Sequence, residues 1–235
     1  MLKCVTITGA DDATPLETLV ELNAEFPFVE WGILVSMRLG SSRFPSRTWM
    51  DRFAEMAVNE PSFAVSMHVC GEWVRRLLRG KMDWGEFPNV RIVADRVQIN
   101  THAQEHVSTS MALDWMEAQP GKQFIIQLDG VNDHLLDACQ QRQINVAGLF
   151  DRSHGAGVLP DNWPTPRFPN NICGYAGGLS PDNVAEQVEK FQAIRSGWPF
   201  WIDMEGRVRD EDDHLDLTKV RRVLEVCAPL VAKEA

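Results

Sequence analysis

The sequence of 235 residues predicts an α/β protein, a single (β/α)8 TIM barrel with an irregular segment in place of the helix after the sixth strand. Three observations predict this fold. Eight short runs have the composition of strands, and nearly every one is followed by a segment of helical spacing. The runs are mostly apolar throughout, as expected for parallel strands covered on both faces. No run is left over for an edge strand, which favours a closed barrel and predicts one domain over residues 1–235.

In the N-terminal half, strands are predicted at residues 4–8, 29–36, 62–70 and 96–100. Helices are predicted from residue 14, around residues 49–56, at 72–79 and at 103–118. The first of them begins with the sequence TPLE, in which an N-cap threonine, a proline and a capping-box glutamate are in register. The last two stop at Gly80 and at Pro120-Gly121. Residues 81–95 are irregular.

In the C-terminal half, strands are predicted at residues 123–128, 145–150, 172–176 and 199–203. The helix after the fifth strand places Leu135, Leu136 and Cys139 on one side. Residues 151–169 are too rich in glycine and proline for a full helix. The helix after the seventh strand is predicted to begin at Pro181 with Ser180 as its N-cap. A last helix follows the eighth strand, with apolar residues at helical spacing from residue 217.

Composition narrows the function. The net charge of −10 argues against a nucleic-acid partner. No apolar run is long enough to span a bilayer, and acidic residues near the N-terminus take the place of a signal peptide, so we expect no membrane partner and a cytoplasmic location. The five scattered cysteines form no CxxC motif. The first strand lacks the GxGxxG fingerprint of dinucleotide-binding proteins, and we expect no cofactor. A monomer and a homodimer are both compatible with the sequence.

A glycine turn after the seventh predicted strand is the strongest candidate for a ligand site. Gly177 and Gly178 leave the backbone bare directly before Ser180 and Pro181, where a helix is predicted to start. Backbone N–H groups at such a turn bind anions, and the usual anion is a phosphate. An ordinary strand-to-helix turn is the alternative interpretation.

With the strand ends aligned, the chain resembles phosphoribosylanthranilate isomerase, a barrel enzyme that performs an Amadori rearrangement. The segments that carry the resemblance are AGGLSPDNV at 176–184, GSSRFPS at 40–46, LFDRSHGAGV at 149–158 and HLDLTKVRRVLE at 214–225. The resemblance implies that Asp151 is a general acid and that Arg43 holds a ligand carboxylate. The phosphate site that it implies contains Gly177, Gly178 and Ser180, and we expect Gly206 and Arg207 after the eighth strand to contribute to it. Asn100 and Asp129, at two other strand ends, are predicted to contact the substrate.

The chain departs from the family pattern at the catalytic base, at the end of the fourth strand and in part of the phosphate site. Thr8 stands where the family has a catalytic cysteine, and a hydroxyl cannot take a carbon-bound proton without a base beside it. Cys4 is no substitute, because it lies about 13 Å down the strand at roughly 3.3 Å per residue. Asn100 stands in place of a family histidine. After the eighth strand, Glu205 would repel a phosphate and Arg207 would attract one. We therefore expect little or no isomerisation of phosphoribosylanthranilate.

Three functions remain open. The first is a cofactor-free aldose–ketose (Amadori-type) isomerase of a small phosphorylated molecule, with Asp151 and Thr8 as catalytic residues and a base supplied by Asp11, Asp12, Asp129 or His68. The second is a barrel that binds such a ligand without chemistry. The third is a metal-dependent sugar-phosphate epimerase, aldolase or hydrolase with ligands from His68, His102, Asp129, Asp151 and His154. Asp151 and Asp129 could also be turn-formers, and Arg43 an exposed loop residue.

Overall fold

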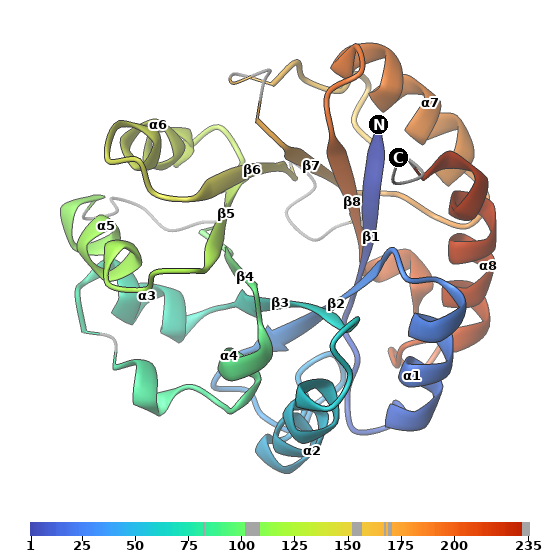
Figure 1. Ribbon diagram of the computed structural model, residues 1–235, viewed down its shortest axis with the longest axis horizontal. Coiled ribbons are helices and arrows are strands. Elements are labelled where there is room, and N and C mark those ends of the chain that lie inside the picture. Colours follow the sequence, from blue (N-terminus) through green and yellow to red (C-terminus); the bar gives the residue numbers. More distant parts are fainter. Residues whose placement is uncertain (82, 102–108, 152–156, 167, 169–170, 232–235) are drawn as a thin grey trace.

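The computed structural model describes residues 1–81, 83–101, 109–151, 157–166, 168 and 171–231, and every structural statement below concerns these. Eight parallel strands close into a barrel in sequence order, with β1 paired to both β2 and β8 (Figure 1). The strands are β1 (Leu2–Thr8), β2 (Val29–Val35), β3 (Ala64–Val69), β4 (Arg96–Ile99), β5 (Gln123–Leu128), β6 (Val146–Phe150), β7 (Cys173–Ala176) and β8 (Phe200–Met204). The predicted eightfold barrel is confirmed, and the strand boundaries shift by one or two residues.

Helices surround the barrel (Figure 1). They are α1 (Leu16–Glu25), α2 (Arg47–Val58), α3 (Glu72–Leu78), α4 (Val90–Val93), α5 (Thr109–Glu117), α6 (Asp133–Gln141), α7 (Val184–Arg195) and α8 (Leu217–Cys227), with 3-10 turns η1 (Trp84–Glu86), η2 (Gly206–Val208) and η3 (Ala228–Leu230). The described part of the segment between β6 and β7 contains no helix, as the sequence predicts. In the described chain, no helix has both the length and the apolar character needed to cross a membrane.

Two predicted helix starts are wrong. α7 begins at Val184 and not at Pro181, because the side chain of Asn183 accepts a hydrogen bond from the Ser180 N–H at 2.9 Å and closes a separate turn. At α1, the Thr14 hydroxyl accepts from the N–H of Asp11 at 3.1 Å and does not cap the helix. The irregular segment 81–95 contains η1 and α4. The first part of the helix predicted at 103–118 lies outside the described residues, and α5 covers the rest.

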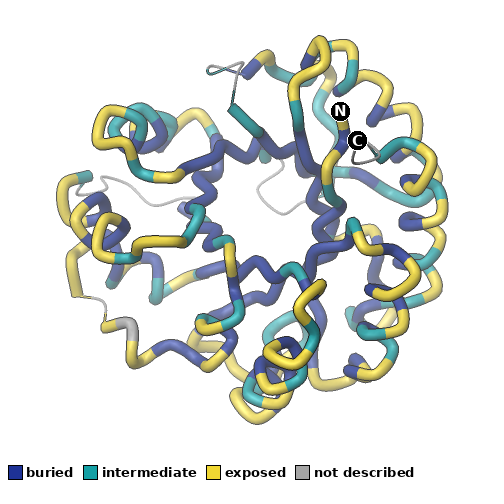
Figure 2. Tube along the Cα trace, viewed as in Figure 1, coloured by how far each residue is buried: buried dark blue, intermediate teal, exposed yellow. Residues whose placement is uncertain are grey.

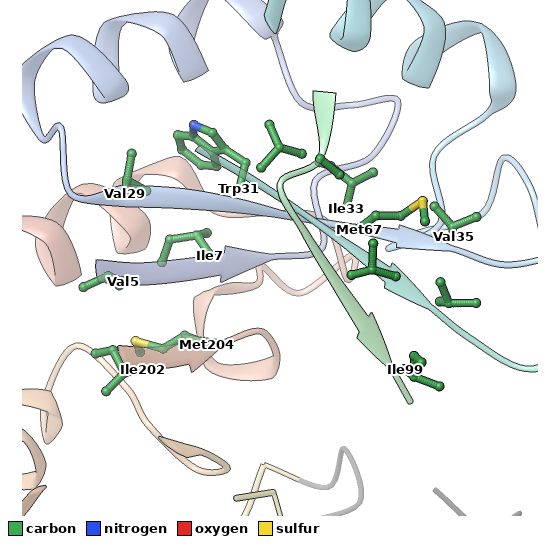
Figure 3. Packing of buried hydrophobic residues seen from close by; sticks show 14 of the residues in the cluster. Val5, Ile7, Val29, Trp31, Ile33, Val35, Met67, Ile99, Ile202 and Met204 are labelled. Carbon is green, nitrogen blue, oxygen red and sulfur yellow. The ribbon is translucent and has the colours of Figure 1, made fainter. Parts of the chain in front are cut away.

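The outward faces of the strands pack against the helices in the main hydrophobic core. Figure 3 shows part of this layer, with Val5 and Ile7 from β1 beside Trp31 from β2 and Ile202 from β8. The tube in Figure 2 is buried along the strands and exposed on the outer faces of the helices. This layer accounts for the apolar runs from which the strands were predicted.

The inward faces of the strands are unlike a typical apolar barrel interior. On one side, Ile125, Ala147, Leu149, Ala176 and Trp201 form a small apolar cluster. On the other side, Arg96 and Glu30 form a buried ion pair at 3.1 Å, and the Thr6 hydroxyl donates to Glu30 at 2.6 Å. The Arg96 guanidinium lies 4.0 Å above the Trp201 ring and so joins the two halves. The barrel interior is therefore apolar on one side and holds a buried ion pair on the other.

Candidate active site

One cavity of about 550 Å³ opens at the C-terminal ends of the strands, where a barrel of this kind carries its chemistry. Residues from β2 to β8 and the loops after them line it. Among them are seven of the predicted site residues, which are Arg43, Asn100, Asp151, Gly177, Gly178, Gly206 and Arg207. The cavity thus brings together side chains from almost the whole length of the chain.

Thr8 has a titratable neighbour that the sequence did not identify. Its hydroxyl donates a hydrogen bond of 2.7 Å to Oδ1 of Asp203, and both residues are buried. Asp203 also lines the cavity. The pKa of Asp203 is raised to about 8. Burial is the largest cause, the hydrogen bond from Thr8 acts in the opposite direction, and the carboxylates of Glu205 and Asp151 contribute to the rise. A carboxyl group with a pKa this close to neutrality is well suited to accept a proton.

The closure of the barrel creates this pair, since β8 lies beside β1 with Asp203 opposite Thr6. The sequence contained one signal for it. Asp203 ends an otherwise apolar strand that closure must place next to β1, and it has the same inward parity as Trp201.

His68 lies next to Thr8 on the other side of Gly32. A Cβ atom at Gly32 would collide with the Thr8 hydroxyl oxygen and would lie 3.1 Å from Cε1 of His68. The histidine is buried, and burial, followed by the charge of Arg96, lowers its pKa to about 3. His68 is therefore neutral at physiological pH and serves as a hydrogen-bonding group, not as a charge.

The three other proposed bases are held elsewhere. Asp11 accepts from the backbone N–H of Arg43 at 3.2 Å and pairs with Arg209 and His214. Asp12 accepts from the N–H and hydroxyl of Ser46 at the start of α2. Oδ1 of Asp129 accepts from two successive N–H groups of its own turn, those of residues 131 and 132, as in the turn-forming alternative. Asp129 is not among the residues that line the cavity.

Amide side chains line the cavity around Asp151 and Asn100. Gln127 donates to Oδ2 of Asp151 at 2.9 Å, and Gln98 donates to Asn100 at 2.9 Å, which in turn donates to the Cys70 sulfur at 3.1 Å. The side-chain oxygens of Gln98 and Gln127 and Nε2 of His68 are buried at the cavity without a protein partner among the described residues. Unpaired polar atoms of this kind are ready to bind ligand hydroxyl groups or water.

Arg43 is already paired with carboxylates. Its Nη1 lies 2.9 Å from Glu205, and its Nε and Nη2 donate to Asp213 at 2.8 and 2.7 Å. These contacts raise the pKa of Arg43, and the hydrogen bonds that it donates to Asp213 are the largest cause. Arg43 has a backbone φ of +72°, which is uncommon for a residue with a side chain. Arg43 lines the cavity, where the carboxylates of Glu205 and Asp213 already bind its guanidinium.

The predicted phosphate-binding residues lie together between β7 and η2. Gly177 and Gly178 both have positive φ, +106° and +68°. A side chain at Gly178 would collide with the backbone of Leu159, so this glycine is required by loop packing whether or not a ligand binds. Arg207 donates to the Gly157 carbonyl at 3.2 Å and faces the cavity. Ser180 lines a neighbouring hollow with Lys219 and Arg222, and Gly178, Gly206 and Arg207 line both this hollow and the main cavity.

In the described part of the chain, no three His, Cys, Asp or Glu side chains are grouped so that they could hold a metal ion. Two of the proposed metal ligands, His102 and His154, lie outside the described residues.

Cys4 is deep in the barrel beside Arg96 at 3.7 Å, and burial raises its pKa to about 12, so this thiol is unreactive.

Fold and site together define a parallel eight-stranded barrel with one polar, carboxylate-rich cavity at the C-terminal ends of its strands. No family model and no curated protein matches the sequence significantly. Among solved structures, the chain is similar to phosphoribosyl anthranilate isomerase from Thermus thermophilus, with a TM-score of 0.62 and 18% identity over 97% of this chain and 99% of that chain. This similarity confirms the fold that the sequence resemblance implied.

Proposed function

We propose that the protein is a cofactor-free aldose–ketose isomerase of a phosphorylated, sugar-type ligand. The observation that carries the proposal is the hydrogen bond between Thr8 and Asp203, because it places a buried carboxyl where the family resemblance requires a base and Thr8 alone cannot act as one. Asp203 is the base in this proposal, and Thr8 orients it.

Asp151 is the acid. It gives its proton to the ring oxygen of the sugar as the bond from that oxygen to C1 breaks, which leaves a C=N or C=O double bond at C1. Asp203 then removes the proton from C2, and the C2–H electron pair forms a C1=C2 double bond. The π pair of the C1=N or C1=O bond moves to its nitrogen or oxygen, which takes up a proton, so that an enaminol or enediol forms. A proton then adds at C1 while the C2 hydroxyl loses its proton to form C2=O, which completes the isomerisation with no net gain or loss of electrons or protons. Both acids line the cavity, and Gln127 orients Asp151.

Glycine backbone and a cation support a phosphate at the other end of the ligand. Gly177, Gly178, Gly206 and Arg207 line the same cavity as the two acids. A phosphate held there would fix the sugar relative to Asp203 and Asp151, and such positioning is a large part of catalysis by enzymes of this kind.

Exchange of the C2 proton with solvent deuterium tests this proposal directly. Ribose 5-phosphate and its N-aryl glycosides are incubated with the protein in D2O, and loss of the C2–H signal is followed by proton NMR. We expect exchange by the wild type, a fall of roughly 10²- to 10⁴-fold in Asp203→Asn, and a fall in Asp151→Asn for glycosides. Binding of the phosphate esters without exchange would overturn the isomerase proposal in favour of a non-catalytic binding barrel.

A further inference from the structure

We propose that Glu205 closes Arg43 to ligand carboxylates, so that the cavity selects ligands that are uncharged at the end distant from the phosphate. The inference concerns the substrate class of the same site and rests on the proposed function only for the phosphorylated end. It makes Glu205 a residue that determines specificity.

The guanidinium of Arg43 already binds two carboxylates of the protein. The edge formed by Nε and Nη2, which suits bidentate binding, is taken by Asp213, with contacts from 2.7 to 3.0 Å. Nη1 donates to Oε1 of Glu205 at 2.9 Å. Each of the three nitrogens therefore already donates to a carboxylate of the protein itself.

Charge around Arg43 disfavours a further anion. Arg43 and Arg209 are the two guanidinium groups of the cluster, and three carboxylates surround them, those of Asp11, Glu205 and Asp213. His214 lies on the far side of Asp11 at 3.0 Å. A ligand carboxylate at Arg43 would enter a cluster in which acids already outnumber guanidinium groups, and unfavourable juxtaposition of like charges is a common basis of specificity.

The backbone of the loop 40–44 holds Arg43 in position for its ion pair with Glu205. Arg43 has φ of +72°, and its N–H donates to Asp11 at 3.2 Å, while the loop closes through a hydrogen bond of 2.9 Å from the Gly40 N–H to the Phe44 carbonyl. Phe44, the next residue in the chain, lines the cavity, as does Leu34 of β2. The surface next to the closed ion pair is therefore partly apolar, which suits an uncharged aromatic or aliphatic group.

A matched pair of fluorescent probes tests the inference by equilibrium binding. 2-Aminobenzoate and 2-aminobenzamide have nearly the same shape and differ in charge. We expect the wild type to bind the amide at least about tenfold more tightly, and Glu205→Gln to shift the ratio towards the carboxylate by about tenfold or more. Glu186→Gln removes an exposed acid of α7 that pairs with Lys190 and does not line the cavity, and it should leave the ratio unchanged.

Equal binding of the two probes by the wild type would overturn the inference. So would an unchanged ratio in Glu205→Gln, or failure of every variant to bind either probe, provided that circular dichroism shows the variant folded. The measurement needs neither turnover nor a phosphate. A failure of the isomerase proposal in the exchange experiment would therefore leave this result standing, and the two failures can be distinguished.

Discussion

The carboxylate of Asp203 accepts a hydrogen bond of 2.7 Å from the Thr8 hydroxyl, although the two residues lie near opposite ends of the chain. The bond joins the last strand of the barrel to the first. It places a carboxyl group with a pKa of about 8 at the position where the sequence offered only a hydroxyl. Several measurable consequences depend on this bond and on the polar groups around it.

The hydroxyl of Thr8 should set the pH dependence of the exchange reaction. Asp203 acts as a base only when deprotonated, so the rate for the wild type should rise with pH through about 8. Because the hydrogen bond from Thr8 lowers the pKa of Asp203, Thr8→Val should move this rise to higher pH. Thr8→Ser, which keeps a hydroxyl, should restore the wild-type profile. A Thr8→Val profile with an unchanged midpoint would exclude this role.

Stability should fall with pH because of Asp203. Its pKa is about 8 in the folded protein and about 3.9 in an unfolded chain. Between these values the folded state holds one proton more than the unfolded state, so the free energy of unfolding decreases as pH rises from about 4 to about 8. Asp203→Asn should therefore gain stability relative to the wild type over this range, by on the order of a few kcal/mol.

Urea unfolding of both proteins at pH 5 and pH 8 measures this difference. Asp182→Asn is the matched control, because Asp182 is an exposed acid paired with Arg222. A stability difference between wild type and Asp203→Asn that does not change with pH would show that Asp203 titrates normally.

The buried pair beneath the site should be costly to break. Glu30→Ala leaves the Arg96 guanidinium in the barrel interior without its carboxylate, and we expect a loss of about 3–5 kcal/mol in the free energy of unfolding. Asp114→Ala removes an exposed partner of Arg142 and should cost less than about 1 kcal/mol. Denaturant titration compares the two, and similar losses would contradict the burial argument.

Two glycines inside the barrel should respond differently to alanine. Gly32→Ala would push against the Thr8 hydroxyl and His68, so the exchange rate should fall by on the order of 10²-fold through displacement of the base. Gly174→Ala would collide with Trp201 and Leu149 in the apolar half, and should cost about 1–3 kcal/mol of stability. Thermal melts and exchange rates on both variants separate these effects. Normal exchange by Gly32→Ala would place the reacting group elsewhere.

Arg207 should carry the affinity for phosphate. Removal of a charged hydrogen-bond donor costs about 1.5–3 kcal/mol, so Arg207→Ala should raise the Kd for inorganic phosphate by roughly tenfold or more in calorimetry. Arg222→Ala is the control, because Arg222 lines the neighbouring hollow and not the main cavity. A larger effect of Arg222→Ala would move the anion to the hollow beside Ser180.

Local sequence was sufficient for the fold. Strand runs such as 123–128 are apolar enough to be recognised singly, because the outward faces of the strands pack against helices and the turns between elements carry glycine or proline. Gly177 and Gly178 could also be predicted as a turn from the sequence, because a positive φ strongly favours glycine. Helix starts are harder to predict. The side chains of Thr14 and Asn183 accept hydrogen bonds from N–H groups of the preceding turn and do not cap a helix, and other residues of these turns could do the same.

The barrel fold, its strand order and the loops at the C-terminal ends of its strands could therefore be predicted from local sequence patterns. The sequence also showed that Thr8 lacks the chemistry of a base. Only the tertiary structure decided which acid stands beside Thr8, because β1 and β8 become neighbours when the barrel closes. It likewise decided that Arg43 pairs with Glu205 and Asp213. Hydrogen bonds and ion pairs depend on positions in space, and residues 162 and 170 positions apart in the chain carry no local pattern that announces them.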